Sequence, residues 1–317
     1  MANANEEAAR RAAREVLADL GIAAYPIQPD DIAQARGLAI EPRSDFPAGV
    51  FGALWRSGNG FGIIVSSACP TPAHRRFTIA HELGHYHVDG HVEQLFASGN
   101  TVAPSLGGHF RNQRDPVEVE ADAFAGELLV PTAFARSLLD GAPVGMHAVL
   151  RLRDAFDVSL SCAAIRLAQL ADEALVVVLS KDGVVEWTAR SAALWEQGGW
   201  ARRSWKQEWT PRGSGTRRLA GDAARRRSGA DDASELLACE WCEGAPPTAM
   251  AIEESVGLGE YDRVLTVVRF PDLPDPDTTY LRAQREEREE RMARDETGQR
   301  DDWRSGLRPY GWDEVDD

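Results

Sequence analysis

Residues 75–91 have the sequence RRFTIAHELGHYHVDGH, and the segment HELGH at its centre carries the main chemical signal of the chain. His81 and His85 are four residues apart, so on a helix they lie about 40° apart around the axis and one turn apart along it. Both imidazoles can therefore reach one ion. Glu82 is displaced by roughly 100°, which lets its carboxylate approach water on that ion without binding the ion itself. This H-E-x-x-H spacing predicts two zinc ligands with a general base between them.

The composition indicates a protein with a real core and an acidic surface. The 317 residues are 43% hydrophobic, which is enough to bury a core and to form about two domains. A net charge of −15 argues against a surface that as a whole binds nucleic acid or anionic membrane. Residues 1–21 are charged and amphipathic, without the apolar centre of a signal peptide, and no apolar run approaches the roughly 20 residues of a membrane span. Four cysteines do not make a disulfide scaffold, so we expect a cytoplasmic protein.

Residues 1–145 are predicted to form one α+β domain around the HELGH helix. We expect helices at 5–20 and 30–37 and three short strands at 38–43, 50–57 and 61–67. The second and third strands are joined by Gly58-Asn59-Gly60, a hairpin signal. Residues 92–114 have the composition of a loop, and a second apolar helix lies between Pro116 and Pro131.

The remaining chain divides into three predicted parts. Residues 146–171 predict a helical element that resembles a helix-turn-helix, but it lacks basic residues suited to a DNA groove, so packing is its expected role. Residues 172–275 predict a separate C-terminal α+β domain, which begins with the hairpin ALVVVLSKDGVVEWTAR and to which we assign a sensor or regulatory role. Residues 276–317 form a charged tail rich in Arg and Glu.

A catalytic zinc keeps three protein ligands and one open position, and two candidates exist for the third ligand. His91 stands six residues after the second histidine of HELGH, as in metzincins, but that pattern requires a glycine where Val88 stands. Glu118 lies on the second apolar helix, with Asp122 one turn later on the same face, where it can orient a ligand imidazole. Glu120 is displaced by roughly 200° and would point away. From these residues alone, a merely acidic helix face is the simpler interpretation.

Two segments, RRFTIAHELGHYHV at 75–88 and EVEADAFAGELLVP at 118–131, resemble the ImmA/IrrE family of metallopeptidases in this order and separation. The resemblance covers about residues 8–170 and includes PIQPDDIAQARGLAIEPR at 26–43. The family usually has a Met where Val130 stands, which is a conservative difference.

The resemblance implies a zincin-like fold with a gluzincin ligand set. By it, the zinc ligands fall on His81, His85 and Glu118 and the general base on Glu82, while His91 is not a ligand. Asp122 keeps the role of a carboxylate that supports a ligand imidazole. The expected cofactor is Zn²⁺, which Mn²⁺ can replace.

The resemblance also implies a function. Members of the family cleave or inactivate helix-turn-helix transcriptional repressors, which relieves repression in stress or mobile-element responses. We therefore expect a zinc endopeptidase whose substrate is a separate repressor encoded nearby. The alternatives are an antirepressor or sensor that acts by association, and a toxin–antitoxin or phage-defence component. Tyr86 and His109 are the nearest candidates by sequence for a donor to the oxyanion.

Two further features have ordinary alternatives. Cys239 and Cys242 form a single C-x-x-C, which cannot close a structural zinc site, and two partly buried thiols are the simpler interpretation. Residues 198–230 are basic, and four tryptophans lie in or beside this stretch (Trp195, Trp200, Trp205 and Trp209). Such a stretch can bind single-stranded nucleic acid or an acidic partner. We favour a solvated loop whose tryptophans pack on their own domain.

Overall fold

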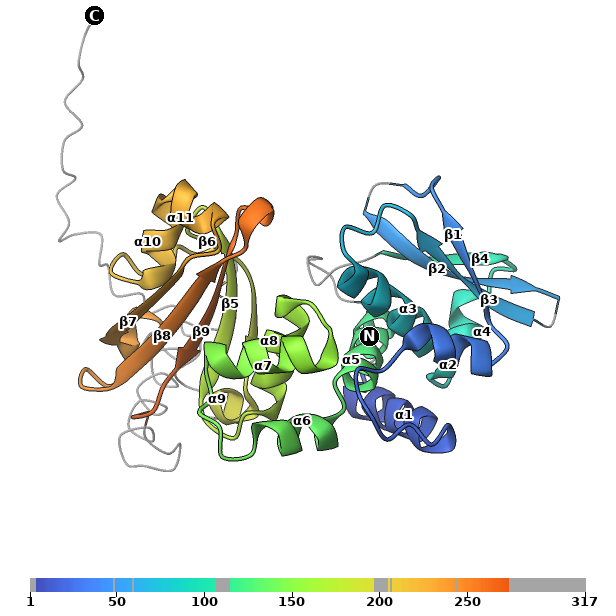
Figure 1. Cartoon of the computed structure of the whole chain (residues 1–317), viewed down its shortest axis with the longest axis horizontal. Helices are drawn as coiled ribbons and strands as arrows, with labels where there is room; N and C mark the ends of the chain where they lie inside the picture. The colour runs from blue at the N-terminus through green and yellow to red at the C-terminus, as the bar shows by residue number, and fades with distance from the viewer. Residues whose placement is uncertain are drawn as a thin grey trace, which may run out of the picture.

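The computed structural model describes residues 4–47, 49–58, 60–106, 115–196, 205, 207–242 and 245–273. These residues form two lobes, an N-terminal lobe around a four-stranded sheet and a C-terminal lobe around a five-stranded sheet (Figure 1). The prediction of an α+β chain with a second sheet domain is confirmed. The charged tail predicted at 276–317 lies outside the described residues. No helix in the part of the chain that the structure describes is long and apolar enough to cross a membrane.

The N-terminal lobe combines its sheet with the helices that precede and follow the strands. In chain order its elements are α1 (Glu6–Asp19), α2 (Pro29–Ala35), β1 (Ala39–Arg43), β2 (Val50–Ser57), β3 (Gly60–Ser66), α3 (Pro72–His87), α4 (His91–Leu95), β4 (Val102–Leu106) and α5 (Pro116–Leu129). The strand order is β1-β3-β2-β4, with β1 parallel to β3 and the other pairs antiparallel. Helix α3 packs on β2 and β3, α5 packs on α3, and α1 packs on α5.

The sheet has four strands where the sequence predicted three. The additional strand β4 comes from the stretch that was expected to be a loop, and Pro104 on it lies opposite Ala53 of β2. A proline cannot donate a hydrogen bond, so it masks a strand in the sequence. It is tolerated here because β4 is an edge strand of the sheet.

The C-terminal lobe follows the helices that connect it to the first. Its elements and connectors are α6 (Thr132–Leu139), α7 (Met146–Phe156), α8 (Leu160–Leu170), β5 (Leu175–Lys181), β6 (Val184–Arg190), α9 (Ala192–Glu196), α10 (Gly215–Gly221), α11 (Ala223–Arg227), β7 (Asp231–Leu237), η1 (Ala238–Glu240), β8 (Met250–Gly257), η2 (Gly259–Tyr261) and β9 (Val264–Arg269). The strand order is β6-β5-β9-β8-β7, all antiparallel. The hairpin between β5 and β6 turns at Asp182 and Gly183, both with positive φ.

The five-stranded sheet is covered on both faces. Side chains alternate along a strand, so Val177 and Leu179 of β5 face the core shared with α7 and α8, while Val176 and Val178 face a second cluster. The helical element at 146–171 therefore packs against protein, as its lack of basic residues indicated. It joins the first lobe through Arg166 of α8, which is buried and contacts Glu127 of α5 at 2.8 Å.

Candidate metal centre

Helix α3, which carries HELGH, is fixed by its cap and by its apolar side. Thr71 caps the helix by accepting a hydrogen bond from the backbone N–H of His74 at 3.1 Å, and Pro72 occupies the first turn, where its missing N–H costs nothing. Ile79 and Leu83 are completely buried in the core. This burial sets the rotation of the helix about its axis, and the rotation decides where the two histidines of HELGH point.

The glycine of HELGH allows α5 to approach α3 closely. A Cβ atom at Gly84 would lie 3.1 Å from both the Cα and the backbone oxygen of Ala121 on α5. Helix α5 itself begins behind Asp115, whose side chain caps its N-terminus. The close crossing brings the first half of α5, with Glu118 and Asp122, against the histidines of α3.

Three side chains from these two helices converge on one point. The Nε2 atoms of His81 and His85 are 3.0 Å apart. Glu118 Oε2 lies 3.3 Å from His81 Nε2, and Glu118 Oε1 lies 3.5 Å from His85 Nε2. Ligand atoms bound at about 2.0–2.1 Å to a tetrahedral zinc lie about 3.3 Å from one another, so the donor set and its spacing fit this ion. Within the described ranges, this is the group of His, Cys, Asp and Glu residues whose ligand atoms all lie within 4.8 Å of one another.

Burial and the contacts within this group set the protonation of its members. Burial lowers the pKa of His85 to about 4, so this imidazole is neutral at pH 7, the form that binds metals. Burial also opposes the charged form of His81, but hydrogen bonds to Asp122 and Glu118 outweigh it and raise the pKa of His81. The Nδ1 atom of His81 is 2.9 Å from Asp122 Oδ1, a contact that orients the ring so that Nε2 faces the other two side chains. Burial raises the pKa of Glu118 in part, but its contacts with the imidazoles of His81 and His85 outweigh it and hold that pKa well below its usual range.

Glu82 lies beside the three converging side chains and is completely buried. Among the described residues, no donor makes a hydrogen bond of normal geometry to either of its carboxylate oxygens. Burial raises the pKa of Glu82 to about 7, and the charge of His81 and the nearby Ser105 hydroxyl offset only part of that rise. Gly52 of β2 makes room for the carboxylate, since a Cβ atom there would lie 2.5 Å from Glu82 Oε1. An unpaired buried carboxylate is costly, and it is found where a group has a chemical role.

A second set of contacts behind His85 was not foreseen from the sequence. The Nδ1 atoms of His85 and the buried His91 are 3.3 Å apart, and His91 Nε2 is 2.9 Å from Glu120 Oε2. Glu120 does leave the three converging atoms, as its helical position indicated, but it contacts His91. The signal in the sequence was the histidine just after Gly90, whose left-handed conformation returns the chain toward α3 and α5.

Neither candidate for an oxyanion donor gains support from the described contacts. The ring of Tyr86 packs against that of Phe61 with centroids 5.7 Å apart, so it belongs to the packing between α3 and β3. His109 lies outside the described residues. The cysteine pair is not bridged: Cys239 is an exposed free thiol and Cys242 a buried one.

Three arginines in the described part of the basic stretch at 198–230 are paired with acidic side chains of the same lobe. Arg218 and Arg225 contact Asp232 at 2.5 and 3.1 Å, and Arg226 contacts Asp262 at 2.7 Å. Such pairing reduces the positive field that a nucleic acid would meet.

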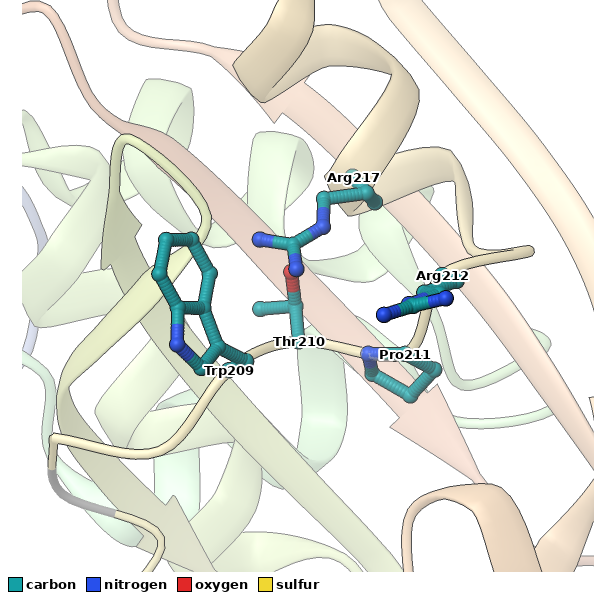
Figure 2. A pocket seen from close by; sticks show the side chains of 5 residues that line it. All are labelled: Trp209, Thr210, Pro211, Arg212 and Arg217. Atoms are coloured by element: carbon teal, nitrogen blue, oxygen red, sulfur yellow. The ribbon is translucent and has the colours of Figure 1, made fainter. Parts of the chain in front are cut away.

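The tryptophans of this stretch differ in their environments. Trp205 is buried, as expected for packing on its own domain, whereas Trp209 is 66% exposed. The Arg217 guanidinium lies over the Trp209 ring, 4.3 Å from its centroid. These two residues, with Thr210, Pro211 and Arg212, line a pocket of the C-terminal lobe (Figure 2). None of the residues predicted to bind or activate a metal lies in it.

Comparison with known proteins agrees with this geometry. The two imidazoles and one carboxylate that converge here are a donor set that catalytic zinc sites use. Residues 47–168 match the model of the Peptidase_M78 family, described as the IrrE N-terminal-like domain, so this segment of the chain is similar to that family's domain. The matched segment contains the HELGH helix and all of α5. No curated protein matches the chain.

A solved structure of a Mycobacterium tuberculosis transcriptional regulator has a similar fold. It shares 13% sequence identity with the chain at a TM-score of 0.53, and the match covers 84% of this chain and 76% of the regulator. The similarity at this identity concerns the arrangement of the elements, and it extends over both lobes.

Proposed function

We propose that this chain is a zinc endopeptidase in which His81, His85 and Glu118 hold the ion and Glu82 is the general base. The observation that carries the proposal is the convergence of three ligand atoms within 4.8 Å of one another, beside a buried carboxylate. The two imidazoles and one carboxylate leave a fourth position free, as catalytic zinc sites require. The family domain at 47–168 supports the same assignment.

Each side chain has a distinct task in this proposal. When bound, zinc polarises the peptide carbonyl and lowers the pKa of water to about 7. Glu82 takes the proton of the attacking water and delivers it to the leaving amine. Among the described residues no donor makes a hydrogen bond of normal geometry to its oxygens, although the Ser105 hydroxyl and the Leu54 backbone lie close enough to lower its pKa. Asp122 holds the ring of His81 in place through their contact of 2.9 Å.

We propose further that the substrate is a helix-turn-helix transcriptional repressor, a separate protein encoded nearby. Cleavage would relieve repression in a stress or mobile-element response. The IrrE-like family domain supports this assignment. The Mycobacterium tuberculosis protein of similar fold is described as a transcriptional regulator, which agrees with a role in transcription.

An antirepressor that acts only by association would need the fold but not the base. The presence of Glu82, and of Gly52 that accommodates it, favours cleavage over association alone. A toxin–antitoxin or phage-defence component that used the lobe only as a scaffold would likewise not need Glu82.

The test is to incubate the full chain with a repressor encoded beside it and to follow cleavage by mass spectrometry. We expect the zinc-loaded wild type to cut the repressor at one position, while Glu82→Gln and the chelator-treated wild type leave it intact. Glu93→Gln is the matched control, since Glu93 is an exposed carboxylate of α4 outside the site. Cleavage by Glu82→Gln at the wild-type rate would refute the mechanism. An intact repressor that nevertheless loses DNA binding would favour association.

A further inference from the structure

A series of hydrogen-bonded polar groups begins at His85, on the side of its ring opposite the three converging atoms. His85 Nε2 faces His81, while His85 Nδ1 is 3.3 Å from Nδ1 of His91. His91 Nε2 is 2.9 Å from Glu120 Oε2, and the other oxygen of Glu120 accepts a hydrogen bond from the backbone N–H of Asn5 at 2.6 Å. These hydrogen bonds thus join four elements, α3, α4, α5 and the start of α1.

The direction of each hydrogen bond in this series follows from Glu120, the side chain farthest from the converging atoms. The carboxylate of Glu120 can only accept, so His91 Nε2 carries a hydrogen and donates it. In a neutral His91, Nδ1 is then an acceptor, so His85 Nδ1 carries a hydrogen. His85 is left with its lone pair on Nε2, the atom that faces the other two side chains. Glu120 therefore sets, through His91, the tautomer that His85 needs to bind an ion.

The same geometry excludes His91 as a ligand. Its Nδ1 contacts the back of the His85 ring, and its Nε2 is occupied by Glu120. His91 is also nearly completely buried, at 2% exposure, so its ring is held by packing as well as by hydrogen bonds. Its position is that of a support for the ligand.

We propose that His91 and Glu120 are positioning residues that orient His85 and fix its tautomer, with Asn5 anchoring Glu120 from the N-terminal helix. The proposal rests on the function proposed above, because the role of His85 is defined by the ion. It gives the site two different supports: His81 contacts the carboxylate of Asp122 directly, whereas His85 reaches a carboxylate through a second imidazole. It also assigns a task to Asn5, the N-cap of α1, whose backbone N–H holds Glu120 in place.

The experiment measures the zinc affinity of the full chain by competition with a chromophoric chelator, and the visible spectrum of the cobalt-substituted protein. The variants are His91→Phe, which removes the acceptor, and Glu120→Gln, which cannot serve both of its donors. His91→Asn retains an oxygen close to the position of Nδ1. The matched controls are His147→Phe, an exposed histidine of α7, and Glu93→Gln.

We expect His91→Phe and Glu120→Gln to weaken zinc binding about 10–100-fold and His91→Asn to restore most of the loss, as for other residues that support a metal ligand. The cobalt spectrum of the first two variants should change, because a rotated His85 alters the ligand field. A variant that merely folds less well would bind less cobalt with an unchanged spectrum, which would overturn the proposal. If His91→Phe does not fold, His91→Asn and Glu120→Gln decide the question.

The outcomes separate this proposal from the function on which it rests. If His91→Phe and Glu120→Gln both keep the zinc affinity and the cobalt spectrum of the wild type, the positioning role is refuted, while the proposed peptidase function is unaffected. If the wild type binds zinc with the expected dependence on His91 and Glu120 but cleaves no repressor, the repressor-cleaving function is refuted and the positioning role is retained. A wild type that binds no zinc would overturn both.

Discussion

Replacing Glu82 with glutamine should remove a loss of stability that the metal-free wild type suffers as the pH rises. The folded protein holds the pKa of Glu82 at about 7 because burial disfavours the carboxylate, whereas the ordinary value is 4.5. Between these two values the unfolded chain has ionised Glu82 and the folded chain has not. The wild type therefore loses stability as the pH rises from about 4.5 to 7, and the loss stays constant above that.

The magnitude follows from the two pKa values. Linkage gives a loss of about 1 kcal/mol at pH 5 and about 3 kcal/mol at pH 8, so the change across this interval is about 2 kcal/mol. Glutamine does not titrate, so the substitution removes this term. Any cost of the buried amide is the same at both pH values and cancels when the two are compared.

The assay is urea unfolding of chelator-treated wild type and Glu82→Gln at pH 5 and pH 8, followed by circular dichroism. We expect the difference in unfolding free energy between the two proteins to shift by about 2 kcal/mol toward the variant at pH 8. Thr78→Ser, a neighbour of Gly52 that does not titrate, is the control and should show no such shift. A difference that is the same at both pH values would refute the account, because it would mean that Glu82 is ionised and solvated in the folded protein.

Three further predictions concern the same lobe. Gly52→Ala places a Cβ atom 2.5 Å from Glu82 Oε1 and 2.6 Å from Thr78 Cγ2, so it should displace the carboxylate, abolish cleavage and leave zinc content near the wild-type level; unchanged cleavage would contradict this. Zinc binding should release a proton near pH 7, because hydrogen bonds to Asp122 and Glu118 raise the pKa of His81, and zinc affinity should therefore rise with pH. Calorimetry in buffers of different ionisation enthalpy measures the number of protons released, and a pH-independent affinity would contradict the prediction. Arg166→Met should destabilise the protein by about 3 kcal/mol, because it leaves the completely buried carboxylate of Glu127 without its ion-pair partner. Arg153→Met, which breaks the exposed pair with Asp154, should cost about 0–1 kcal/mol. Equal losses of stability in thermal or urea unfolding would contradict this difference.

The sequence predicted the helices of the site better than its supports. The HELGH spacing and the later acidic helix are local patterns, and both segments fold as the helices that they indicate. The contact from His91 to Glu120 joins residues 29 positions apart, and it depends on the turn at Gly90 and on the crossing of α3 and α5. Such a contact leaves no periodic signal. The role of Gly52 is likewise invisible until β2 is placed against α3.

The sheets show the same limit for another reason. Strand β4 was missed because Pro104 interrupts the pattern that marks a strand, although an edge position tolerates it. The hairpin of β5 and β6 was recognisable from its turn, but the pairing of β5 with β9 joins Val176 to Val268. Pairings between distant segments follow from burial of both faces of the sheet, and the chain order alone does not specify them.

The most direct test of the zinc site is the metal content of the purified chain and of its ligand variants, measured by mass spectrometry after removal of loosely bound ions. The account predicts one zinc per wild-type chain and one per Glu82→Gln chain, with loss of the ion in His81→Ala, His85→Ala and Glu118→Ala. A full equivalent of zinc in any of the three alanine variants would contradict the assignment of His81, His85 and Glu118.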